Sequence, residues 1–157
     1  TGSSTFDAAR IMKKQGADIE LVESLVQEPY EMVKKRTEII ASAMRFEDNI
    51  LMSVMREGEY PRSIASQASD TLIQTKDIEA AFVLCYTAKD EVMISARSKG
   101  DMNVQLIMEK MNGGGHKTAA GLQRKDSDID SLKKELETVL RDYLSERKKE
   151  NEGNTVE

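Results

Sequence analysis

The sequence contains little of the two residue types that most often bind transition metals. In 157 residues it has one cysteine, Cys85, and one histidine, His116. A usual zinc site needs several converging Cys or His ligands, so this chain cannot assemble one. The lone cysteine cannot form an intramolecular disulfide, which fits a reducing compartment, and its apolar neighbours predict a buried structural thiol.

Long apolar runs and an excess of basic residues are also missing. The longest apolar run is 80–86, far short of the roughly 20 residues that a membrane-spanning helix needs. The formal net charge is -5. This charge argues against binding of long nucleic acid, because that mode depends on clustered Lys and Arg. A small anionic ligand held in a local pocket remains compatible with it.

The N-terminal part of the sequence is predicted to be helical. It has no initiator methionine and no secretory signal pattern, so we expect a piece of a longer protein. Residues 4–46 read as mostly helical, with a stop at Gly16. Residues 28–47 have apolar side chains at helical spacing and predict one long helix; they are Tyr30, Val33, Thr37, Ile40 and Met44.

The middle of the chain alternates between strand and helix signals. Residues 49–56 predict a strand, and Pro61 suits the start of a helix that runs to about Thr75. Residues 79–87 and 91–98 predict two strands of a hairpin. The resulting order in this part of the chain is strand, helix, strand, strand.

The C-terminal part continues this alternation. A helix is predicted from Asn103 to the glycines at 113–115, followed by a short strand at 119–123. Residues 126–149 predict an amphipathic helix, and the tail 150–157 has little to bury and is expected to be disordered. The order of these helices and strands predicts an α/β fold with a small mixed β-sheet covered by helices, preceded by an N-terminal helical linker.

The stretch "MNGGGHKTAAG", residues 111–121, is the most unusual in the chain. Three glycines give the backbone unusual freedom and let a ligand approach main-chain N–H groups without a Cβ in the way. Phosphate oxygens are natural partners for such groups. The loop follows a helix instead of preceding one, so it is neither a P-loop nor a dinucleotide fingerprint. On its own, such a stretch is more often a helix stop beside a structural histidine than a ligand site.

Arg97 and Ser98 offer complementary chemistry at the end of the predicted strand 91–98. The planar fork of arginine matches two phosphate oxygens, and a serine hydroxyl can add a third bond. His116 can donate to phosphate or lie against a base. No serine stands in a nucleophile elbow and no acidic cluster stands out, so the sequence assigns no catalytic residue and no metal ligand.

Taken together, residues 94–121, "ISARSKGDMNVQLIMEKMNGGGHKTAAG", closely resemble the DHH-associated domain of the DHH phosphoesterase superfamily. Its hallmark is an Arg-Ser pair, a helix, and a GGGH loop followed by a small-small-Gly segment. More narrowly, the opening "TGSSTFDAARIMKKQGAD" and residues 60–84 look like the cyclic di-AMP phosphodiesterases of the GdpP/YybT type.

The resemblance implies that catalysis and nucleotide binding belong to two different domains of a longer parent protein. A DHH domain holds two manganese ions and hydrolyses cyclic di-AMP to 5'-pApA, while the DHH-associated domain binds the nucleotide. The Asp and His motifs of the metal domain are absent from this sequence. We therefore expect residues 1–46 to be the end of a DHH domain plus a helical linker, and residues 47–149 to be the nucleotide-binding domain. The chain alone is expected to bind without cutting and to need no cofactor.

The site residues implied by the resemblance are those that match the motif. They are Arg97 and Ser98 for phosphate or base, Gly113, Gly114 and Gly115 as a main-chain cradle, His116 as a ligand contact, and Asn103 as a weaker candidate that can equally be a helix cap. The implied partners are cyclic di-AMP or 5'-pApA, the DHH domain of the same chain, and a second copy in a homodimer. The implied location is the cytoplasm, with the parent anchored in the membrane.

Three other readings stay open at this point. The same module occurs in DHH-family oligoribonucleases that degrade very short RNA. A related domain accompanies alanyl-tRNA synthetases as an RNA-binding accessory, although the acidic composition and His116 argue against that reading. A purely packing or dimerising domain is the third.

Overall fold

The computed structural model of the chain describes residues 27–153. The chain divides into two units, residues 1–33 and 34–157, and the sheet lies in the second. The helices expected before residue 27, and the end of a DHH domain expected at residues 1 to about 25, lie outside the described residues. None of the helices within 27–153 combines the length and apolarity that would let it span a membrane.

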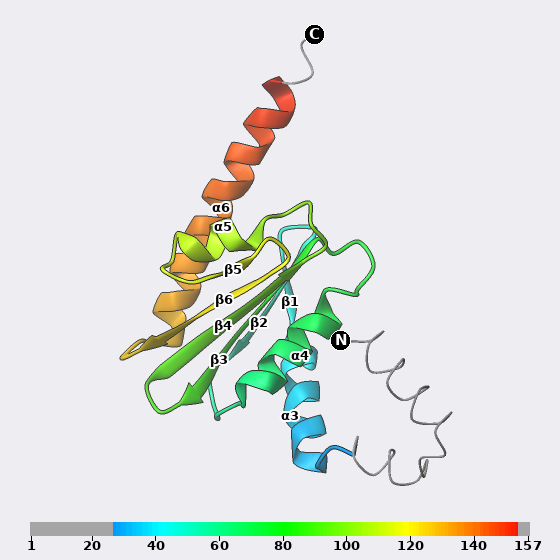
Figure 1. The fold of residues 1–157 in the computed structure, drawn as a ribbon, viewed down its shortest axis with the longest axis vertical. Helices are drawn as coiled ribbons and strands as arrows, with labels where there is room; N and C mark the ends of the chain where they lie inside the picture. Colours follow the sequence, from blue (N-terminus) through cyan, green and yellow to red (C-terminus); the bar gives the residue numbers. More distant parts are fainter. Residues whose placement is uncertain (1–26, 154–157) are drawn as a thin grey trace, which may run out of the picture. The chain divides into compact units, whose positions relative to one another are not determined.

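Within the described range the chain forms one mixed sheet of six strands, in the order β1-β2-β3-β4-β6-β5 (Figure 1). The strands are β1 (Met44–Phe46), β2 (Ile50–Met55), β3 (Ala80–Ala88), β4 (Glu91–Ser98), β5 (Gly114–His116) and β6 (Ala119–Lys125). The helices are α3 (Tyr30–Ala41), α4 (Arg62–Leu72), α5 (Val104–Glu109) and α6 (Ile129–Gly153). The predicted α/β class, a small mixed sheet covered by helices, is confirmed.

Helix α4 is the crossover that joins the only parallel pair among the described strands, β2 and β3. It begins directly after Pro61, which has no N–H group to leave unpaired at a helix start. The helix ends at Leu72, slightly before the predicted end at Thr75. One face of α4 is buried against β3 and β4; its buried residues are Ile64, Ala65, Ala68, Ser69 and Leu72.

Strands β3 and β4 form the predicted hairpin. Asp90 in its turn adopts a left-handed conformation with φ of 57°, and the pairing register shifts between Tyr86 and Ala88. Residues 80–85 of β3 are all buried because helices cover both faces of the sheet there. This explains why β3 reads as a continuous apolar run instead of an alternating one.

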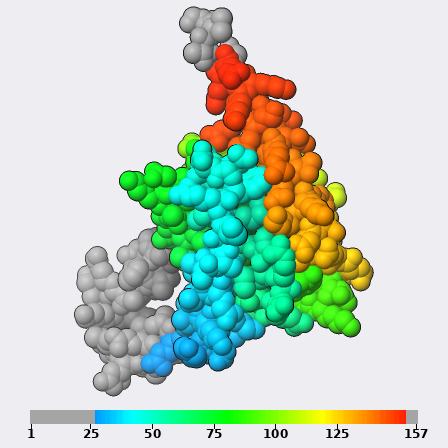
Figure 2. All heavy atoms as spheres, turned by 180° about the vertical axis from the view of Figure 1, so that it is seen from behind, coloured from blue at the N-terminus to red at the C-terminus, as the bar shows by residue number. Residues whose placement is uncertain are grey.

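Helices α5 and α6 pack over the opposite face from α4 and complete the main core. That core contains Phe82, Leu84, Ile94, Ile107, Met108, Leu132, Leu136 and Leu140, all fully buried or nearly so. Figure 2 shows α6 alongside the segment of β1 and β2, where the Arg141 guanidinium lies 5.3 Å from the centroid of the Phe46 ring. Burial of such large side chains stabilises a fold by about 1.5–3 kcal/mol each.

Two predictions about element boundaries were wrong. Residues 44–46 form strand β1 instead of continuing the helix, because their backbone pairs with Ile50, Leu51 and Met52 of β2. This tertiary pairing overrides a weak local helix preference. Helix α6 continues to Gly153, so residues 150–153 of the expected tail are helical.

Candidate functional site

The glycine segment begins as a helix stop. Helix α5 ends at Glu109, and Asn112 then takes a left-handed conformation with φ of 62°. The N–H of Gly113 donates to the Met108 carbonyl at 2.8 Å, which satisfies an end carbonyl of the helix. Only the first of the three glycines therefore belongs to the helix end.

The rest of the segment is a strand, which corrects the prediction of a loop. Gly114, Gly115 and His116 form β5 and pair antiparallel with Gly121, Ala120 and Ala119 of β6. A short turn at 117–118 joins the two strands. The ladder places His116 at the outer edge of the described sheet.

The three glycines meet different surroundings. A Cβ built on Gly113 would lie 2.6 Å from the Gly121 carbonyl oxygen, and one on Gly115, where φ is 143°, would lie 2.5 Å from the Ala120 Cα. These two positions exclude any side chain. A Cβ on Gly114 would have no atom within 4 Å. The Gly114 backbone is thus open to an approaching molecule.

Strand register places Arg97 and His116 on the same face of the sheet. Ala119 of β6 pairs with Arg97 on one side and with His116 on the other. Residues directly opposite in antiparallel strands point to the same face, so the three form one row across β4, β6 and β5. The two outer Cα atoms of this row are roughly 10 Å apart, twice the usual strand spacing.

This face is the one that carries α4. Arg97 Nε donates to Asp70 Oδ1 of α4 at 2.6 Å, and Ser95 Oγ lies 2.7 Å from Ser69 Oγ. Helix α4 packs over β3 and β4. Beside it, a hollow of about 410 Å³ lies over β4 and β6; it is lined by Arg62, Ser66, Ser95, Arg97, Gly121 and Gln123 among others.

The Arg97 side chain is held in a fixed orientation. Besides the ion pair with Asp70, its Nη1 donates to the Ala96 carbonyl at 3.0 Å and to Ser95 Oγ at 3.3 Å. Its Nη2 has no hydrogen-bond partner among residues 27–153, and the side chain is 21% exposed. The exposed His116 ring likewise makes no hydrogen bond within that range. Both groups can donate to a ligand.

The structure does not bring Ser98 or Asn103 to this face. Successive residues of a strand point to opposite faces, so Ser98 turns away from Arg97 and is only 8% exposed. Its hydroxyl donates to the Lys117 carbonyl at 3.3 Å. Asn103 Oδ1 accepts from the backbone N–H groups of Gln105 and Leu106, at 3.1 and 3.4 Å. Asn103 is therefore the cap of α5, and Ser98 ties β4 to the turn after β5.

Sequence reasoning missed several residues that the fold brings to this face, among them Asp70, Ser95, Gly121 and Gln123. Ser95 had a usable signal, because it is two residues from Arg97 and strand periodicity places both on one face. Asp70 had none, because the crossover helix brings it to Arg97 from a distant part of the sequence.

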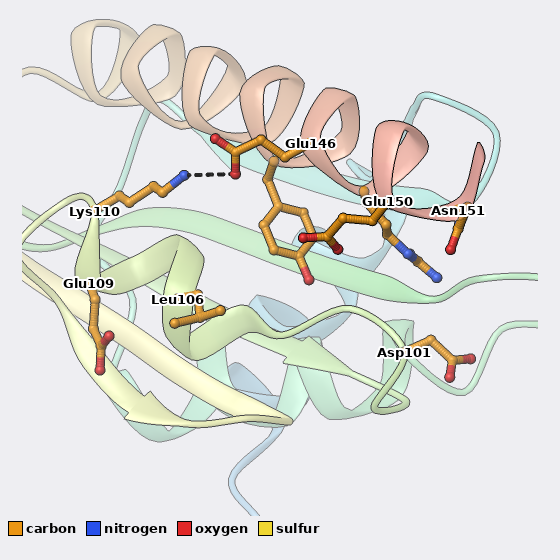
Figure 3. A pocket seen from close by; sticks show the side chains of 9 residues that line it. Asp101, Leu106, Glu109, Lys110, Glu146, Glu150 and Asn151 are labelled. Atoms are coloured by element: carbon orange, nitrogen blue, oxygen red, sulfur yellow. Dashed lines mark hydrogen bonds and ion pairs between the residues drawn. The ribbon is translucent and has the colours of Figure 1, made fainter. Parts of the chain in front are cut away.

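A larger hollow of about 650 Å³ lies between α5 and α6 (Figure 3). Its wall includes the carboxylates of Asp101, Glu109, Glu146 and Glu150. Its two cations are already paired, Lys110 with Glu146 at 3.4 Å and Arg147 with Glu79 at 2.9 Å. The hydrogen bond to Glu79 raises the pKa of Arg147 above its usual value. Because its wall is acidic, this hollow repels phosphate, and the Arg97 face is the better candidate despite its smaller volume.

The described residues do not fit a metal centre. No group of three or more His, Cys, Asp or Glu side chains within 27–153 could hold a metal ion. Cys85 is fully buried, and burial raises the pKa of its thiol to about 12, so the thiolate that metals bind does not form at neutral pH.

Comparison with known proteins identifies the domain family of the chain. The DHHA1 domain profile matches residues 47–142. The chain is 35% identical to the cyclic-di-AMP phosphodiesterase GdpP of Bacillus subtilis and 39% identical to that of Geobacillus thermodenitrificans, over 92% of its length in both cases. It spans only 22% of the length of these relatives.

The fold recurs among solved structures. An exopolyphosphatase-related protein from Bacteroides fragilis superposes with a TM-score of 0.70 at 16% identity, over 91% of this chain and 44% of that one. Because the DHHA1 family model matches residues 47–142, more than half of the chain, the chain belongs to the DHHA1 domain family, and its sequence is similar to that of the GdpP-type phosphodiesterases.

Proposed function

We propose that this chain is the nucleotide-binding module of a cyclic di-AMP phosphodiesterase. The row formed by Arg97, Ala119 and His116 supports this proposal most directly. It places one hydrogen-bond donor on each side of Ala119, whose side chain is small. The similarity to two proteins named as cyclic-di-AMP phosphodiesterases supports the choice of cyclic di-AMP as the ligand class.

The chemistry of this row suits a phosphodiester. Arg97 Nη2 supplies a charged N–H donor that no described residue occupies, and Asp70 keeps the rest of the guanidinium in place. The His116 ring supplies a second donor from the opposite side. Gly114, two residues before His116 on β5, leaves the main chain beside this row open. Hydrogen bonds from charged donors to phosphate are shorter and about twice as strong as neutral ones, so Arg97 supplies the larger share of affinity.

The proposal assigns hydrolysis to a different part of the parent protein. The manganese ions and the water that they activate belong to a DHH domain of the same parent, in the cytoplasm beside the membrane. Within this chain, Arg97 and His116 bind and orient the nucleotide. Addition of manganese to this chain should accordingly give no hydrolysis.

Titration calorimetry tests the proposal directly. Cyclic di-AMP and 5'-pApA should bind, and Arg97→Ala should weaken binding at least about tenfold, which is about 1.4 kcal/mol of binding free energy. Arg56→Ala is the matched control, because it also removes an arginine from an ion pair, with Asp130 at 2.9 Å, on a side chain that is 53% exposed. It should leave affinity unchanged.

Three outcomes would count against the proposal. Absence of binding by both adenine dinucleotides at millimolar concentration would overturn it. Equal loss in Arg97→Ala and Arg56→Ala would show that only net charge matters. Tighter binding of a short RNA than of either dinucleotide would favour an oligoribonuclease module instead.

A further inference from the structure

The hollow beside α4 continues past the Arg97 row along the strands. Ser95 pairs with Gly121, and Met93 pairs with Gln123, and both pairs lie on the same face as Arg97 and Ala119 because they are two and four residues along. The distance from Ala119 to Gln123 along β6 is roughly 13 Å. The hollow, which Arg97 lines and His116 does not, therefore has an end beyond the Arg97 row.

This end has a flat floor and a wall on one side. The floor is the backbone of Gly121, where an added Cβ would lie 2.5 Å from the Ile94 carbonyl oxygen. The half-buried Met93 thioether extends this floor, and Arg62 and Ser66 of α4 line its side. A polarizable thioether beside bare backbone favours contact with a planar ring over contact with a charged group.

Most polar side chains in this part of the hollow already have partners. Ser95 Oγ bonds with Ser69 and Arg97, and Arg62 lies 3.4 Å from the Glu91 carboxylate. Gln123 differs, because its exposed carboxamide makes no hydrogen bond to any residue between 27 and 153. It presents one donor and one acceptor in a single plane at the edge of the floor.

We infer that Gln123 reads the base of a bound nucleotide and selects adenine over guanine. The inference rests on the proposed function and adds a base subsite to it: phosphate at Arg97 and His116, and a purine over Gly121. A glutamine carboxamide matches the N6 donor and N7 acceptor of adenine, whereas guanine presents two acceptors, O6 and N7, at the same edge.

Binding of cyclic di-AMP and cyclic di-GMP to Gln123→Ala tests the inference. The ratio of the two affinities should fall at least about fivefold, which corresponds to the lower range for loss of one bidentate base contact. Gln105→Ala is the matched control, since Gln105 is a half-buried glutamine that bonds to Glu109 on α5 at 2.8 Å and lies outside the hollow. Its affinity ratio should equal that of the unmodified chain.

A second variant checks the chemistry of the contact. Gln123→Glu keeps the shape but replaces the N–H donor with an acceptor that faces adenine N7, so affinity for cyclic di-AMP should fall without a change in melting temperature. An affinity ratio unchanged in both Gln123 variants would overturn the inference.

The two proposals fail in different ways. If cyclic di-AMP binds and Arg97→Ala weakens it while Gln123→Ala changes nothing, only the base subsite is wrong. If the unmodified chain binds neither cyclic di-AMP nor 5'-pApA, both proposals are wrong.

Discussion

Arg97 and His116 both pair with Ala119 of β6, one from β4 and the other from β5. The two side chains are far apart in the sequence, yet the ladder places them in one row on one face. The residue between them, Ala119, has only a methyl group, so no long side chain separates the two donors. This arrangement makes the mutational behaviour of the nearby glycines and of Arg97 predictable.

Gly114→Ala should weaken nucleotide binding while the fold keeps its stability. The added Cβ meets no atom within 4 Å, so it projects into the space that a ligand would use. Gly115→Ala should instead destabilise the domain by about 1–3 kcal/mol, because φ is 143° and the Cβ would lie 2.5 Å from Ala120. Thermal unfolding and calorimetry on both variants separate the two effects. Equal losses of melting temperature would contradict the assignment.

Arg97→Lys should lose most of the affinity that Arg97→Ala loses, although the charge is retained. The guanidinium bonds to Asp70, Ala96 and Ser95 and still has Nη2 left to donate, and a single ammonium cannot reproduce this fork. Calorimetric titration with cyclic di-AMP gives the comparison, with Arg56→Lys as the control. Affinity close to that of the unmodified chain in Arg97→Lys would mean that Arg97 contributes only charge.

Cys85 should resist alkylation in the native protein. Burial raises the pKa of its thiol to about 12 from an ordinary value of 9.0, so the reactive thiolate is absent at pH 8 and the sulfur is inaccessible. The raised pKa also makes the folded state bind a proton that the unfolded state releases. This contribution to stability is full below about pH 9 and is lost as pH rises toward 12.

The measurements are iodoacetamide labelling at pH 8, with and without urea, and urea unfolding between pH 8 and 10. Cys85→Ala should lose less stability over this pH interval than the unmodified chain. Rapid labelling of the native protein would contradict the buried, protonated thiol.

Local sequence signals predicted the longer elements well. Helix α4 after Pro61, the hairpin of β3 and β4, and the long C-terminal helix all have periodic apolar patterns or a clear start signal. Strands β1 and β5 were missed because each has only three residues and no period of its own. Their structure depends on pairing with β2 and β6, which no local pattern encodes.

The candidate site was predictable in part. Arg97 and His116 were identified by their motif, and the fold brings them to one face. Ser98 was grouped with Arg97 because the two are adjacent in sequence, but adjacency in a strand means opposite faces. Asp70 and Gln123 could not be found without knowing the strand order and the path of the crossover helix.

Arg97 and Ser98 point to opposite faces of β4, and this alternation of side chains limits how the sequence of such a domain can change. Odd-numbered residues of β4 and β6 face the hollow, while even-numbered ones, such as Ile94 and Leu122, are part of the core. A family built on this sheet can therefore exchange its odd-numbered residues, other than Gly121, to acquire new ligands with little disturbance of its interior. An insertion of one residue within β4 would reverse both roles at once, so substitution is the route of change that this architecture permits.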